Sequence, residues 1–455
     1  MRNQITEGSI PKQLLAFFFP IWAGTFFQFF YNTADAAIVG NFLGKEALSA
    51  VGGSSSTIIN LLVGFFVGLS SGATVIVSHL YGARDHDGTS RAVHTATALA
   101  LVGGAFMTVL GIAVSPWALR AMGTPERVLG PSITYLRIYF CGMIFNIMYN
   151  LGSGVLRATG DSRRPLYFLI VGCVSNIVLD FLFVVVIPMG VAGAAFATIL
   201  SQAISAVLVV LSLRQSDGCC RLHLSKIRFD FALLWRMMRI GLPAGLQSVM
   251  YSASNIVIQT TINGFGTNAM AAWTAYGKID GIFWMTVNSF GIAITTFVGQ
   301  NFGARRFDRV KKSVHVCFGF SALASVLLSA FVLVLGPQLY HLFSRDADVV
   351  SIGILMLRCM VPFYVLYIPI EILSGALRGA GDAIMPMLIP AFGICFLRIL
   401  WIAFVTPLYP QIEVVCMSYP VTWGVTSVLC FLYYKWGGWL RRCSARLGHG
   451  SADAL

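Results

Sequence analysis

Two aspartates stand inside long apolar stretches of the chain, where ionisable side chains are rare. Asp35 closes a polar stretch that begins at Tyr31, and Asp180 follows Asn176 by one helical turn, which places these two side chains on one helix face. A charge in the hydrocarbon of a bilayer costs at least about 2.5–3.5 kcal/mol, so such residues usually face a cavity or a partner. Two carboxylates with an amide form an oxygen-rich site for H+ or Na+. The alternative is a pair of hydrogen-bonded structural acids.

The elements that must position these residues are apolar segments long enough to cross a bilayer. Of the 455 residues 57% are hydrophobic and only 11% charged, with a mean hydropathy of +0.78. This excludes a soluble enzyme, in which about a quarter of the residues would be charged. The runs are continuously apolar, unlike the short alternating strands of a porin-like barrel, and a membrane-spanning helix needs about 20 residues. We predict an all-α integral membrane protein with twelve transmembrane helices, at 14–38, 54–80, 93–115, 133–156, 166–187, 191–213, 240–262, 270–298, 313–335, 352–375, 385–407 and 414–434.

One unit of sequence occurs twice. Residues 156–161 (L-R-A-T-G-D) recur at 377–382 as L-R-G-A-G-D, and the Gly-Ala-Arg of 82–84 recurs at 303–305. Each half holds six predicted helices, so both halves enter the membrane in the same orientation and form two pseudo-symmetric bundles, as is typical of secondary transporters. We predict an N-terminal six-helix lobe at 1–213, a cytoplasmic linker at 214–230, a C-terminal six-helix lobe at 231–435 and a cytoplasmic tail at 436–455.

Positive charge is concentrated on one side of the predicted membrane. If both termini share a side, the loops there hold most of the 31 lysines and arginines, whereas the opposite loops hold Lys45, Arg120, Arg127 and Arg345. The positive-inside rule then makes both termini cytoplasmic, which agrees with an even number of spans. Topology explains the net charge of +13, so no nucleic-acid partner is expected.

A different set of charges lies in the apolar segments of the second half: Lys278, Asp280, Glu371 and Arg398. These residues could form an internal ion-pair network or line a substrate cleft, and a lysine in such a cleft would disfavour a purely cationic range of substrates. The aspartate pair itself is confined to the first half, because Ile258 and Trp401 stand at the repeat positions of Asp35 and Asp180.

Motifs for catalysis, ATP hydrolysis or resident metals do not emerge. The sequence has no G-x-x-x-x-G-K-[ST] phosphate loop and no H-E-x-x-H. Residues 379–382 match the G-x-G-D of intramembrane aspartyl proteases, but they lie on the basic side and have a twin at 158–161, so we interpret them as a helix-ending turn. We expect no enzyme, no cofactor and no metal site other than the Na+ alternative at the aspartates.

These motifs together resemble the multidrug and toxic compound extrusion (MATE) family. The repeated L-R-x-x-G-D, the two Gly-Ala-Arg turns and Asp35 with Val39-Gly40 carry the resemblance, which runs from about Glu7 to about Tyr434. It implies a V-shaped transporter of two six-helix bundles. It also implies secondary active export of lipophilic or cationic small molecules by antiport against H+ or Na+ with alternating access.

The resemblance also assigns residues. It implies a cation-binding, proton-coupling site at Asp35, Asn176, Asp180 and Thr198, and a kink of the first helix at Pro20. Some members have an acid on the seventh helix, where this chain has Gln247, Asn255 and Gln259, so a second cation site of that type is not expected.

Partners and location follow from the same resemblance. We expect small-molecule substrates, chiefly organic cations, a lipid bilayer, a monomer and a bacterial inner (cytoplasmic) membrane. An alternative is a lipid-linked precursor flippase of the same superfamily, which would need a strongly basic cavity for pyrophosphate, although only Lys278 and Arg398 are deep bases. A non-transporting membrane scaffold is a third interpretation, and the presence of both aspartates speaks against it.

Overall fold

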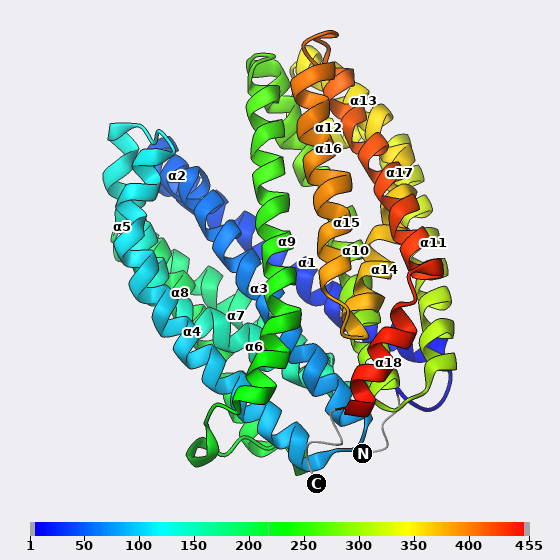
Figure 1. Ribbon diagram of the computed structural model, residues 1–455. Helices are drawn as coiled ribbons and strands as arrows, with labels where there is room; N and C mark the ends of the chain where they lie inside the picture. Colours follow the sequence, from blue (N-terminus) through cyan, green and yellow to red (C-terminus); the bar gives the residue numbers. More distant parts are fainter. Residues whose placement is uncertain (1–4, 217, 450–455) are drawn as a thin grey trace. The chain divides into compact units, whose positions relative to one another are not determined.

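The computed structural model describes residues 5–216 and 218–449, and the regular secondary structure of this part of the chain is entirely helical, without a strand (Figure 1). The first half contains α1 (Ile10–Leu43), α2 (Lys45–Gly52), α3 (Ser54–Gly82), α4 (His86–Ala121), α5 (Glu126–Cys141), α6 (Met143–Ala158), α7 (Arg163–Asp180), η1 (Phe181–Val186) and α8 (Val191–Gln215). The connecting segment contains η2 (Gly218–Cys220) and η3 (Leu224–Lys226). The second half contains α9 (Phe231–Asn263), α10 (Thr267–Gly303), α11 (Phe307–Val334), α12 (Gly336–His341), α13 (Ala347–Met360), η4 (Val361–Tyr367), α14 (Ile368–Gly379), α15 (Ile384–Pro390), η5 (Ala391–Phe396), α16 (Leu397–Leu400), η6 (Trp401–Val405), α17 (Ile412–Trp436) and α18 (Trp439–His449).

Most of these helices suit a bilayer. Within the described ranges ten helical segments are long and apolar enough to cross a membrane, and the pair α5 and α6, bent by 47°, would make an eleventh. The remaining predicted span corresponds to α9, which has 33 residues but is not among the ten. The expectation of an all-helical membrane protein is confirmed. The predicted C-terminal tail, in addition, contains the helix α18.

The sequence repeat is also a repeat of backbone conformation. Arg84 and Arg305 adopt φ of 60° and 57°, and Gly160 and Gly381 adopt φ of 97° and 93°. A positive φ is uncommon for a residue other than glycine, and these arginines are the two such residues in the described chain. The twin motifs therefore form twin turns at the ends of equivalent helices.

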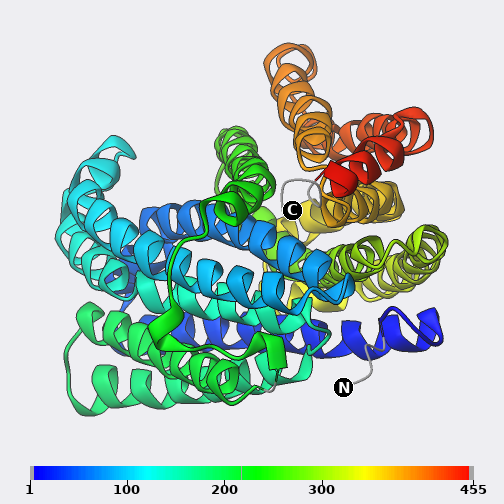
Figure 2. The same ribbon diagram turned by 60° about the horizontal axis from the view of Figure 1, so that its bottom comes forward.

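The described chain packs as two compact units. One comprises Ala16–Gly245, and the other comprises Ile5–Leu15 together with the chain from Leu246 onward. Both α1 and α9 are thus shared, since each begins in one unit and ends in the other. In the first unit α4, α6, α8 and α7 follow one another side by side (Figure 2). The lobe boundaries expected around residues 214–230 remain a prediction.

Glycines allow one close helix contact in the first unit. A Cβ added to Gly72 would meet the backbone of Met237 and, at 2.6 Å, the nitrogen of Gly241; a Cβ on Gly68 would lie 2.6 Å from Cα of Gly245. The small-residue face of α3 therefore packs directly on the first turns of α9, as small-xxx-small faces do in membranes.

Candidate functional site

The predicted cation site starts from two polar side chains of α7 that are buried and make no hydrogen bond to the other helices of the described chain. Asp180 is 0% exposed and Asn176 is 1% exposed. No group of the described residues donates a hydrogen bond to either oxygen of Asp180, and neither amide atom of Asn176 has a hydrogen-bond partner. Leaving a buried polar group unpaired costs about 1–3 kcal/mol, and more when the group is charged. Such a cluster of oxygens can receive a proton or a cation, and the cation site itself stays a prediction.

Asp35 of α1 completes a pair of carboxyl groups with Asp180. The two side chains interact with each other, and Oδ1 of Asp35 is buried without a hydrogen-bond donor. Two carboxylates side by side repel unless they share a proton or bind a cation. The structure thus brings together two acids that lie far apart in the sequence.

Thr198 of α8 lies at the level of Asn176. The helices α7 and α8 are antiparallel neighbours, because Gly172 packs against Ser205 at one end of their contact and Gly193 packs against Phe183 at the other. The Thr198 hydroxyl is buried and donates a hydrogen bond of 3.0 Å to the carbonyl oxygen of Ala194. Its oxygen can still accept a hydrogen bond or ligate a cation.

Sequence reasoning missed two features of this site. Tyr135 of α5 is buried and interacts electrostatically with both aspartates, but a tyrosine in an apolar segment gives no signal in the sequence. The π-helical turn η1 begins directly after Asp180, and η6 occupies the equivalent place in the second half, starting at Trp401. Such turns often occur at functional sites. Both halves have this irregularity, but only the first combines it with an acid.

In the second unit, Asp280 of α10 is held by two donors. The Tyr364 hydroxyl donates a hydrogen bond of 2.5 Å to Oδ1, and the Trp284 indole donates one of 2.5 Å to Oδ2. The ring of Tyr364 stacks on Phe283 with centroids 4.0 Å apart, which fixes the position of the hydroxyl. This carboxylate is satisfied by the protein itself, in contrast to Asp180.

Two of the other predicted charges of this unit, Glu371 and Arg398, contact residues outside the predicted set. Oε1 of Glu371 is 3.6 Å from Nη2 of Arg378, which follows it by two helical turns on α14. The guanidinium of Arg398, 3% exposed, lies 3.9 Å from the ring centroid of Tyr419, and its Nη2 donates a 3.4 Å hydrogen bond to Thr422. The ion pair of Glu371 is thus with Arg378, and an internal network of the four predicted charges stays a prediction.

Aromatic rings connect these charged residues. Trp423, itself buried, packs against Trp284, Tyr364, Tyr367 and Tyr419, the residues that touch Asp280, Glu371 and Arg398. Lys278 lies on α10 two residues before Asp280, and its side chain is exposed. A role of this cluster in lining a substrate cleft remains a prediction, as does a kink at Pro20, which lies within α1.

Long apolar helices in two units, with unpaired acids buried among them, define a multi-pass membrane transporter. The MatE family model matches residues 20–182 and 243–403, one match in each half, and the chain belongs to this family. The probable multidrug resistance protein YoeA of Bacillus subtilis (strain 168) is 30% identical over 456 residues, covering 97% of each chain. An FAD transporter of Shewanella oneidensis is 23% identical over 377 residues, covering 81% of this chain and 80% of its own.

The fold has also been seen in solved structures. A MOP superfamily transporter from Pyrococcus furiosus superposes with a TM-score of 0.90 at 24% identity, covering 98% of each chain. Membership in the MatE family confirms the resemblance drawn from the repeated motifs, and with it the expectation of a transporter rather than an enzyme.

Proposed function

We propose that this transporter exports small organic compounds by antiport against a cation bound at Asp35, Asn176, Asp180 and Thr198. The observation that carries the proposal is the burial of Asp180 beside Asp35 with no donor on either of its oxygens. A proton or Na+ cancels one charge of this pair and relieves its repulsion, and a cationic substrate that approaches the same negative charge displaces it. That competition is the minimum requirement for exchange.

The substrate class is the finer part of the proposal. The relative from Bacillus subtilis is called a probable multidrug resistance protein, which supports varied lipophilic cations as substrates. A second candidate is an organic anion, because Arg398 is buried in the second unit and one relative is called an FAD transporter. Flipping of lipid-linked precursors is less well supported, since the first unit presents acids rather than the bases that a pyrophosphate needs.

Topology and setting complete the proposal. The concentration of basic residues in the loops on one side supports cytoplasmic termini in a bacterial inner membrane. We further propose that one chain suffices for transport, because the cation site is built from helices of a single unit of one chain. No resident cofactor is assigned.

Export of ethidium from proteoliposomes tests the function. Proton and sodium gradients are imposed separately on wild type, Asp35→Asn and Asp180→Asn, with Glu126→Gln as a control that removes an exposed acid at the start of α5. We expect one gradient to drive export in wild type and in Glu126→Gln, and neither gradient to do so in the two aspartate variants.

Other results would redirect the proposal. Ethidium export that persists in both aspartate variants would refute coupling at this site. If ethidium is not moved but FAD is, and Arg398→Gln abolishes FAD transport, the organic anion replaces the cation as substrate.

A further inference from the structure

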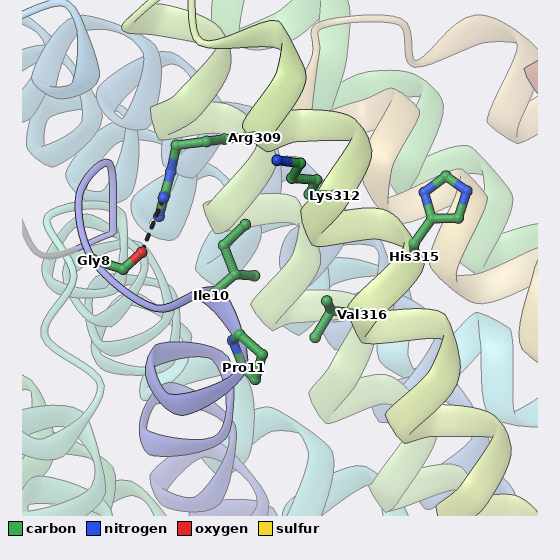
Figure 3. Close-up of a pocket in the computed structure, with 7 residues that line it drawn as sticks. All are labelled: Gly8, Ile10, Pro11, Arg309, Lys312, His315 and Val316. Atoms are coloured by element: carbon green, nitrogen blue, oxygen red, sulfur yellow. Dashed lines mark hydrogen bonds between the residues drawn. The ribbon is translucent and has the colours of Figure 1, made fainter.

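A basic pocket lies in the second unit, where α1 and α11 begin (Figure 3). Its volume is about 430 Å³, and its walls include Ile10 and Pro11 of α1 and Lys312, His315 and Val316 of α11. Neither the cation site nor the aromatic cluster of the second unit includes these residues.

Arg309 builds one wall of the pocket. Its Nε donates a hydrogen bond of 3.1 Å to Oδ1 of Asn301, while Nη1 and Nη2 donate to the carbonyl oxygens of Gly8 (2.9 Å) and Ile5 (3.1 Å). These bonds tie the segment before α1 to α10 and α11, so the pocket has a fixed shape. The positive charge of Arg309 is not cancelled by these neutral carbonyls.

The other two bases of the pocket are exposed and lack an acidic partner. Within the described residues no carboxylate pairs with Lys312: Asp308, one turn earlier on α11, does not, and Glu7 lies 3.9 Å from Arg306 instead. His315 donates through Nδ1 to the carbonyl oxygen of Lys311 at 2.7 Å, so Nε2 is left for a ligand and can donate to a phosphate oxygen when the ring is an imidazolium. Glu7 thus balances part of the charge of Arg306 and Arg309, whereas Lys312 has no acidic partner among the described residues.

The duplicated architecture provides an internal comparison. Arg91 and His94 occupy, after the first Gly-Ala-Arg turn, the places that Lys312 and His315 occupy after the second. There Arg91 pairs with Asp230 at 3.1 Å, and Nε2 of His94 accepts a 3.1 Å hydrogen bond from the backbone nitrogen of His223. The segment connecting the halves thus fills this place in the first unit.

The chemistry and the position of the pocket indicate which ligand binds in the second unit, where no segment of the described chain covers Lys312 and His315. Exposed bases in the first three turns of α11 are followed by an apolar span, so the pocket lies where headgroups meet acyl chains. Ile10, Pro11 and Val316 offer an apolar surface directly beside the bases. We propose that this pocket binds a phosphate ester, the phosphodiester headgroup of an anionic phospholipid, through Lys312 and His315.

Native mass spectrometry of the full chain, delipidated in detergent, tests this proposal. Phosphatidylglycerol and phosphatidylcholine are titrated into wild type, Lys312→Gln, Lys312→Gln/His315→Gln and Lys311→Gln. Lys311 is the matched control, because it is an exposed lysine of the same helix turn that does not line the pocket. A parallel titration repeats the phosphatidylglycerol series in millimolar inorganic phosphate.

We expect the first phosphatidylglycerol to bind about tenfold more weakly to Lys312→Gln, since one charge-assisted hydrogen bond is lost, and more weakly still to the double variant. Lys311→Gln should bind like wild type. Equal affinities of Lys311→Gln and Lys312→Gln, or equal binding of phosphatidylcholine, would overturn the proposal. If inorganic phosphate competes with phosphatidylglycerol, and this competition depends on Lys312, the pocket is a phosphate site whose ligand is a free anion rather than a lipid. Thermal melting confirms folding, and Lys312→Glu, with reversed charge, should lose binding further.

Discussion

Asp180 and Asp280 should respond in opposite directions to the same substitution. Asparagine has nearly the shape of aspartate but no charge, so it removes repulsion and desolvation where the carboxylate is unpaired. At position 180 neither oxygen accepts a hydrogen bond from a donor, and Asp35 is adjacent. At position 280 both oxygens accept a hydrogen bond, each of 2.5 Å. The two sites therefore provide a matched pair for one experiment.

The expected magnitudes follow from these contacts. Asp180→Asn removes an unsatisfied buried charge and should stabilise the fold by about 1–3 kcal/mol in the absence of Na+ at alkaline pH. Asp280→Asn places an amide N–H₂ where one of two donors now binds, and should destabilise by about 1.5–3 kcal/mol. With an unfolding entropy of about 2.1 cal/mol/K per residue, a chain of 455 residues shifts in Tm by about 1 °C per kcal/mol. The Tm values of the two variants should thus differ by roughly 2.5–6 °C.

Tryptophan fluorescence during heating in detergent measures both shifts, with Glu126→Gln as a neutral control. A rise in Tm for Asp180→Asn together with loss of coupled transport would mean that the chain retains a destabilising acid for its function. If Asp180→Asn instead lowers Tm as Asp280→Asn does, Asp180 is a hydrogen-bonded structural acid and the reasoning fails.

Three further substitutions test the packing, each by thermal melting. Gly72→Ala should lower the free energy of unfolding by about 1–3 kcal/mol, because the new methyl group meets the backbone of α9. An unchanged Tm would mean that α3 and α9 are packed less closely than described. Asp161→Ala should lower the free energy of unfolding by about 0.5–2 kcal/mol, because Oδ1 accepts hydrogen bonds from the backbone nitrogens of Arg163 (3.0 Å) and Arg164 (3.1 Å). Asp161→Asn should keep most of this stability, since its side-chain oxygen can still accept these bonds. Equal losses in the two variants would contradict the capping role. Arg398→Lys keeps the charge but should lower the free energy of unfolding by about 0.5–2 kcal/mol, because the stacking of the planar guanidinium on the Tyr419 ring is lost. A wild-type Tm would show that only the charge matters.

The turns that end equivalent helices could be predicted from the sequence, because their motifs occur twice. The helix-ending turn expected at 379–382, with its twin at 158–161, has Gly381 and Gly160 in the left-handed region. The partners of the twin acids could not be foreseen. Asp161 pairs with Arg164 at 3.0 Å, whereas Asp382 accepts a 2.5 Å hydrogen bond from Tyr433 of α17. A repeat specifies local conformation, but long-range partners depend on residues that diverged after duplication.

The charged residues of the candidate site could be predicted from the sequence, because charged residues are rare in apolar helices. Asp35 and Asp180 could be selected because acids stand out in apolar helices. Tyr135 and the aromatic ring system around Asp280 could not, since tyrosine and tryptophan occur throughout such helices and their contacts depend on how each helix is rotated. The same holds for the pairing of Glu371 with Arg378, which two helical turns separate.

The sharing of α1 and α9 between the two units has a consequence for biosynthesis. The segment Ile5–Leu15 emerges from the ribosome before the rest of α1, but it belongs to a unit whose other residues begin at Leu246. The first unit, in turn, lacks the turns of α9 up to Gly245 until more than half of the chain has been made. A nascent chain that ends after α8 would leave the glycine face of α3 uncovered. Translation of α9 is therefore the step that permits the first unit to close, and neither unit could be produced as an uninterrupted fragment cut at the connecting segment.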